Sequence, residues 1–124
     1  MSNITYHYLD ESTLTALVEM MDGDGEMLAE LISTLVDTTP GLMASLEEGL
    51  AERDSTKVRE SAHALKSSNA QLGAIEFANL FNKLEHMGRI NDLSFANDVF
   101  AQIQEEYQRV TAALESWKDK VLNG

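Results

Sequence analysis

Apolar residues recur at every third or fourth position along most of the chain, and this spacing restricts the fold more than any other feature. Between Glu26 and Ala51, leucines follow one another at steps of three, four and seven residues, at Leu28, Leu31, Leu35, Leu42, Leu46 and Leu50. This pattern places the leucines along one stripe of an α-helix, whereas a half-buried strand would alternate apolar and polar residues. The sequence therefore predicts an all-α protein.

Capping residues and glycines divide the chain into five expected helices, at about residues 10–21, 26–51, 54–72, 75–90 and 93–121. Asp10 can cap the first helix, and Asp54 or Ser55 can cap the third. Gly73 supplies the left-handed residue that commonly ends a helix. Pro40 lies inside the second range and removes one backbone donor, so we expect a kink or a local break near Thr38 to Gly41.

Four long helices joined by short loops pack most economically as an antiparallel up-and-down four-helix bundle, with the additional short N-terminal helix across one end. The 124 residues suffice for one domain, 1–124, with one hydrophobic core. No cysteine is present, which excludes disulfides, thiol catalysis and thiolate metal sites.

The formal net charge of −12 argues against nucleic acid or an anionic membrane surface as a partner, because phosphates would be repelled. No apolar run approaches the length of about 18 residues needed to span a bilayer, and no signal segment begins the chain, so we expect a cytoplasmic protein. Positive charge is concentrated in one short segment. Residues 1–52 contain no Lys or Arg, whereas the next fourteen contain four of the nine, Arg53, Lys57, Arg59 and Lys66.

The third helix combines these cations with a histidine that points away from the core. Its apolar stripe consists of Val58, Ala62, Leu65, Asn69 and Leu72. At 100° per residue, His63 projects about 140° from the centre of that stripe. Four other side chains project within about 60° of His63, namely Arg59, Lys66, Ser67 and Ala70. The spacing therefore predicts an exposed imidazole among cations and small side chains.

This arrangement suits a phosphoryl carrier. A phosphorylated imidazole carries about two negative charges, which Lys66 and Arg59 can offset, and Ser67 can donate a hydrogen bond to a phosphoryl oxygen. The small side chains of Ala70 and Ala62 would leave a low surface for a docking partner. A free imidazole titrates at about pH 6.5, so at neutral pH it is largely uncharged and nucleophilic. On spacing alone, however, a solvated surface histidine explains His63 equally well, and the reacting ring nitrogen stays open.

The segment from Ala62 to Ala74, AHALKSSNAQLGA, closely resembles the signature of histidine-containing phosphotransfer (HPt) domains of bacterial phosphorelays. The shared features are a His, a variable residue, Leu, Lys, a small residue, and Gly-Ala ten residues after the His. The resemblance continues through Leu80, Leu84-Glu85 and Gly88-Arg89, and it covers roughly residues 25–115.

The resemblance implies a four-helix bundle with His63 as phosphoacceptor and Lys66 beside it. The chain would accept a phosphoryl group from a receiver-domain aspartate of a hybrid sensor kinase and pass it to an aspartate of a response regulator. It would have no kinase activity, cofactor or metal of its own, since magnesium would belong to the receiver domain. The sequence lacks a glycine-rich ATP loop, which agrees with this role. One departure is Ser67, where the family usually has Gly, and this residue could narrow the choice of partner.

Two other readings are weighed against this one. A helical adaptor that only docks receiver domains would not need His63. A di-iron site would use the Glu60-x-x-His63 pair, but it requires a second such pair, and Lys83 and Ile4 stand three residues before His86 and His7. His86 and His7 are expected to be ordinary surface residues. The absence of linkers favours a monomeric, free-standing carrier.

Overall fold

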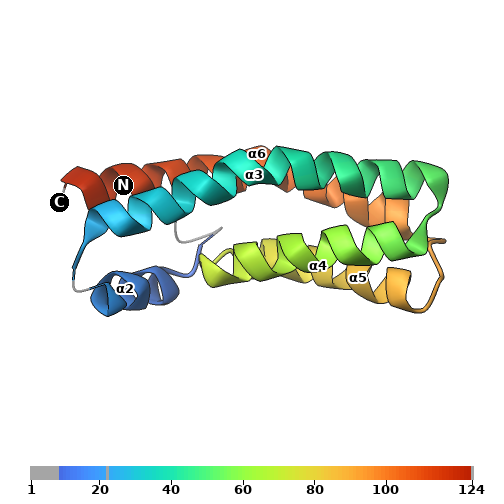
Figure 1. The fold of residues 1–124 in the computed structure, drawn as a ribbon, viewed down its shortest axis with the longest axis horizontal. Coiled ribbons are helices and arrows are strands. Elements are labelled where there is room, and N and C mark those ends of the chain that lie inside the picture. Colours follow the sequence, from blue (N-terminus) through green and yellow to red (C-terminus); the bar gives the residue numbers. More distant parts are fainter. Residues whose placement is uncertain (1–8, 22, 124) are drawn as a thin grey trace.

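The computed structural model describes residues 9–21 and 23–123, and this part of the chain folds into five helices without any strand (Figure 1). The helices are α2 (Glu11–Met20), α3 (Gly25–Glu52), α4 (Ser55–Gln71), α5 (Ile75–Arg89) and α6 (Ala96–Asn123). Each end lies within three residues of the expected position. The all-α fold class is therefore confirmed. No helix among these residues is both long and apolar enough to cross a membrane.

Side-chain caps and one glycine set the helix ends where the sequence predicted them. The carboxylate of Asp10 accepts a hydrogen bond from the backbone N–H of Ser12 at 3.2 Å. The cap of α4 is Asp54 rather than Ser55, since Asp54 accepts from the N–H of Lys57 at 3.1 Å. Gly73 has a φ of +82° after the end of α4, and its carbonyl accepts a hydrogen bond of 2.7 Å from the N–H of Asp10. The turn between α4 and α5 thereby also anchors the start of α2.

The expectation of a break near Pro40 is wrong, because α3 continues through this residue without interruption (Figure 1). Threonine hydroxyls bond to backbone carbonyls in the preceding turn. Thr39 donates to the carbonyl of Leu35 at 2.7 Å, and Thr38 donates to that of Thr34 at 2.9 Å. Pro40 itself is exposed, so water can reach the carbonyl that its missing N–H leaves without a donor. Packing of the buried stripe on both sides of Pro40 then outweighs the local cost.

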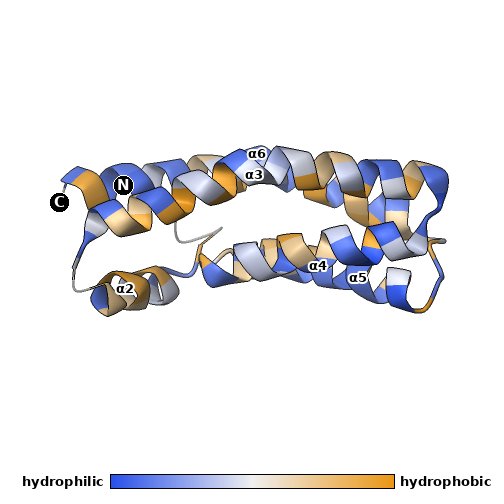
Figure 2. Ribbon diagram, in the orientation of Figure 1, coloured by the Kyte–Doolittle hydropathy of each residue, from blue (hydrophilic) through white to orange (hydrophobic). Residues whose placement is uncertain are grey.

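The four long helices form the predicted antiparallel bundle, with α3 and α6 in one layer and α4 and α5 in the other (Figure 1). Each helix carries both apolar and polar segments (Figure 2). The largest fully buried side chains form one core, namely Leu14, Leu28, Ile32, Leu46, Leu65, Leu72, Phe81, Leu84, Ile103 and Leu114. Of the leucine stripe in α3, Leu31 and Leu42 are half-buried and the other four are buried.

The helices differ in length, and α2 fills the resulting gap. At 1.5 Å per residue, the 28 residues of α3 and of α6 extend about 42 Å, whereas the 17 residues of α4 extend about 26 Å. In Figure 1, α2 lies beneath the overhanging ends of α3 and α6. It runs in line with α4 rather than across the end of the bundle, as the sequence had suggested.

The backbones of α4 and α5 approach each other most closely at Gly88. A Cβ atom at this position would lie 2.7 Å from the carbonyl oxygen of Ser55 and 2.9 Å from the backbone nitrogen of Arg59. Only glycine therefore permits this spacing without movement of the backbone. A hydrogen bond of 2.5 Å from the hydroxyl of Ser55 to Asn91 Oδ1 joins the two helices at the same end.

Candidate functional site

The His63 side chain projects from the middle of α4 into solvent and is 61% exposed. The predicted core stripe of α4 is buried, as Val58, Ala62, Leu65, Asn69 and Leu72 all show. The orientation inferred from helical spacing is thus the one that the structure has. A cleft of about 380 Å³ lies beside His63, and Arg59, Glu60 and Glu85 line it with His63.

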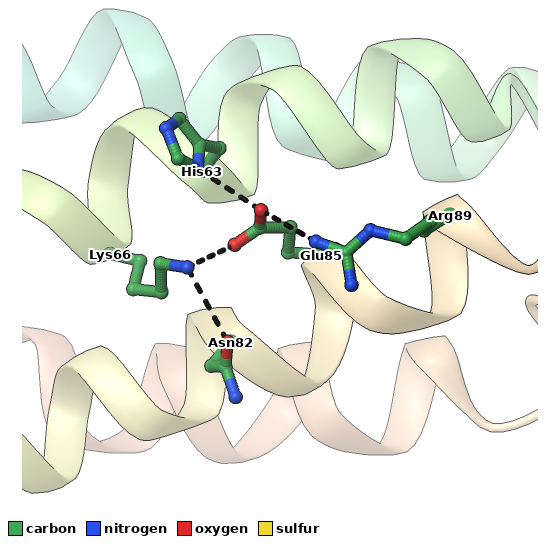
Figure 3. Close-up of polar contacts among 5 residues, drawn as sticks. All are labelled: His63, Lys66, Asn82, Glu85 and Arg89. Atoms are coloured by element: carbon green, nitrogen blue, oxygen red, sulfur yellow. Dashed lines mark hydrogen bonds and ion pairs between the residues drawn. The ribbon is translucent and has the colours of Figure 1, made fainter.

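The carboxylate of Glu85 on α5 connects this histidine to two cations (Figure 3). Glu85 Oε2 lies 3.0 Å from His63 Nδ1 and 3.0 Å from the guanidinium Nη2 of Arg89. Its other oxygen, Oε1, lies 2.6 Å from Lys66 Nζ. The Glu85 side chain is only 7% exposed, and a carboxylate so well covered is stable only with such partners.

These partners keep Glu85 charged. Burial by itself would raise the pKa of Glu85, but hydrogen bonds and charge from Lys66 and His63 outweigh burial, and the pKa lies below its usual value of 4.5. A charged carboxylate can only accept hydrogen bonds, so His63 Nδ1 must carry the hydrogen that it donates to Glu85. The other ring nitrogen, Nε2, then keeps a free lone pair, and Figure 3 shows it on the side of the ring away from Glu85.

The remaining residues expected at the site surround His63 with different degrees of exposure. Lys66 is engaged inside the protein, since Nζ also lies 3.5 Å from Asn82 Oδ1. Arg59 and Ser67 are exposed on α4, and Ala70 is half-buried.

Ala62 does not belong to an exposed docking surface. Its side chain is fully buried, because Ala62 is part of the stripe of α4 that packs on the core. One residue along a helix corresponds to a rotation of about 100°, so the direct neighbour of an exposed His63 turns inward. The expectation that Ala62 contacts a partner is therefore wrong.

Glu85 and Arg89 were not predicted as site residues, although both occur in the segments that resemble the HPt signature. A signal was present in the sequence. His63 and Glu85 are each eleven residues from Ala74, and an antiparallel hairpin with its turn at Ala74 places them opposite each other. Arg89 follows Glu85 by four residues, which is the spacing of an ion pair along one helix.

Side chains that could hold a metal ion are not grouped in the part of the chain that the structure describes. Between residues 9 and 123, leaving out residue 22, no three His, Cys, Asp or Glu side chains lie close enough together. His86 is exposed on α5, and His7 lies outside the described residues.

Comparisons with known proteins agree with this geometry. The family model of the Hpt domain matches residues 30–113. The crystal structure of histidine-containing phosphotransfer protein B (HptB) from Pseudomonas aeruginosa PAO1 has a TM-score of 0.83 and 25% sequence identity, with 91% of this chain and 96% of that chain covered. A comparison with curated proteins finds no match. The exposed histidine, the helical bundle and the family match together show that this chain belongs to the Hpt domain family, whose role is histidine phosphotransfer in phosphorelays.

Proposed function

We propose that His63 accepts a phosphoryl group from the aspartyl phosphate of one receiver domain and passes it to the aspartate of another. The observation that carries this proposal is an exposed imidazole whose Nδ1 is held 3.0 Å from a buried carboxylate. This contact presents the opposite nitrogen, Nε2, to a partner. The notebook of charges around it, a carboxylate below and cations at the sides, suits a nucleophile that becomes a dianion.

The reaction exchanges one bond to phosphorus for another. The lone pair of Nε2 attacks phosphorus, an N–P bond forms, and the bond from phosphorus to the aspartate oxygen breaks, leaving its electron pair on the carboxylate. The ring carries positive charge while Nδ1 keeps its hydrogen, and Glu85 offsets that charge. Transfer to the second receiver domain reverses these steps.

The cations around the imidazole are suited to the phosphoryl oxygens. Lys66 and Arg89 contact Glu85 in the structure, and both have exposed parts from which they can turn toward a phosphoryl group. Arg59 is exposed in the cleft next to His63. We assign Lys66 to stabilising the phosphoryl charge, Arg59 and Ser67 to its neighbourhood, and Ala70 to the docking surface.

The partners follow from the same chemistry. The donor is the receiver domain of a hybrid sensor kinase, and the acceptor is a response regulator. The receiver domain supplies the magnesium ion, and this chain acts as a monomeric carrier without cofactor or ATP.

Label transfer from a phosphorylated receiver domain tests the proposal. The wild-type chain should acquire an acid-labile, base-stable phosphoryl group, which His63→Gln should lack. His86→Gln is the matched control, and it should be labelled like wild type. Wild-type labelling of His63→Gln would contradict the proposal. A wild-type chain that binds receiver domains but never acquires label would instead identify an adaptor.

A further inference from the structure

A second hollow lies at the end of the bundle remote from the α3–α4 turn, between α2 and the last turns of α6. It has a volume of about 390 Å³, within the range of small-molecule sites, which is roughly 300–1,000 Å³. Val18 of α2 and Val121 of α6 form apolar walls, and Gly23 and Gly25 border it at the start of α3. We refer to this hollow as the α2–α6 cleft.

Trp117 brings an unused hydrogen-bond donor to the α2–α6 cleft. The residue lines the cleft and is only 6% exposed. Its indole Nε1–H is buried and has no hydrogen-bond partner among the described residues. A buried N–H without an acceptor costs free energy, so a bound group with an acceptor oxygen would be favoured here.

Lys120 adds a cation next to that donor. Its Nζ lies 4.8 Å from the centre of the Trp117 ring and 3.6 Å from Glu11 Oε1. The Lys120 side chain is 65% exposed, and an ion pair as open as this one with Glu11 is weak. The ammonium group is therefore available to an anion in the cleft. Glu19 also lines the cleft and opposes an anion by repulsion, which makes the two residues a test of ligand charge.

We propose that the α2–α6 cleft binds a small amphipathic carboxylate. The carboxylate accepts the hydrogen bond of Trp117 Nε1 and pairs with Lys120, while the apolar part lies against Val18 and Val121. This site is independent of His63, which projects from the middle of α4.

Binding can be followed at the site itself, because Trp117 is the single tryptophan of the chain. Octanoate is the probe, and octanamide, which keeps an acceptor oxygen but has no charge, is its neutral counterpart. We expect a saturable shift of the indole N–H resonance by octanoate, with a dissociation constant on the order of 1 mM. Octanamide should bind about fivefold more weakly.

Charge variants give the sharper result. Lys120→Gln should weaken octanoate binding about fivefold, and Glu19→Gln should strengthen it about twofold, whereas octanamide should respond to neither. Lys118→Gln removes an equal charge one turn-fraction away, where Lys118 pairs with Glu115, and it should leave binding unchanged. An indole resonance that octanoate does not shift would mean that the cleft holds water only. Equal binding of the two probes, or equal effects of Lys120→Gln and Lys118→Gln, would likewise overturn the proposal.

Discussion

The middle of α3 and the α4–α5 hairpin both contain residues that weaken helices, but only the hairpin uses such a residue to bring two backbones together. In α3, Pro40 and Gly41 are adjacent and exposed, and a Cβ on Gly41 would have nothing within 4 Å. In the hairpin, Gly88 faces the backbone of Ser55 and Arg59. Glycine in α3 is thus merely tolerated, whereas in α5 it permits the contact that the site needs.

The two regions also differ in charge. No Lys or Arg occurs in α3, and exposed carboxylates such as Glu47 lie on its surface. In the hairpin, one buried carboxylate, Glu85, is in contact with His63, Lys66 and Arg89. The site is built where two helices are closest, and α3 supports it from the other layer. Substitutions in the hairpin should therefore affect transfer, while matched substitutions in α3 should not.

The largest effect is expected from Glu85→Ala. Loss of the carboxylate leaves His63 Nδ1 without its partner, and removing a group that orients a reactive side chain typically costs about 10- to 100-fold. Phosphoryl transfer from a receiver domain should slow by this factor in single-turnover measurements. Glu85→Gln keeps an acceptor oxygen and should lose less. The α3 control, Glu47→Ala, should transfer at the wild-type rate, and an equal loss in both alanine variants would break the comparison.

Gly88→Ala against Gly41→Ala compares the two glycines directly. A methyl group at position 88 must displace backbone, so the free energy of unfolding should fall by about 2 kcal/mol. The same change at position 41 meets open space, and it should raise the free energy of unfolding by about 0.5–1 kcal/mol through helix propensity. Urea unfolding measures both values. Two changes of the same sign would show that the close approach at Gly88 is not a constraint.

Lys66→Ala should slow phosphoryl transfer about tenfold, because it removes a cation that offsets the phosphoryl charge. Lys83→Ala is the matched control within the hairpin. Lys83 is exposed on α5, and its loss changes the net charge equally. Rates that fall alike in the two variants would indicate a general effect of charge on the encounter with the partner.

The smallest expected effect concerns pH. The folded pKa of Glu85 lies below its usual value of 4.5, so the carboxylate stabilises the fold above that pH, and this contribution is lost as pH falls through the lower, folded pKa. Relative to Glu85→Gln, wild type should therefore lose about 1 kcal/mol of unfolding free energy between neutral pH and the acid side of pH 4.5. A difference that stays constant with pH would contradict the ion pairing of Glu85.

Features that depend on neighbouring residues in sequence were predictable. Helical spacing gave the five helices and the exposure of His63, and Asp10, Asp54 and Gly73 marked helix ends, because caps and turns are determined within a few residues.

Features that depend on contacts between helices were not predicted. The role of Glu85 depends on the register of α5 against α4, and the chain gave only the equal distances from Ala74 as a guide. Pro40 was expected to break α3, but packing along the whole helix overrides one missing hydrogen bond. Ala62 was placed on the docking surface by its small size, although its own helical position faces the core.

The most direct test is to identify the phosphorylated nitrogen by NMR in the uniformly ¹⁵N-labelled, phosphorylated protein. The contact of His63 Nδ1 with Glu85 predicts a phosphorus–nitrogen coupling at His63 Nε2, with Nδ1 still bearing hydrogen. A coupling at Nδ1, or a phosphoryl group on any other residue, would contradict the account.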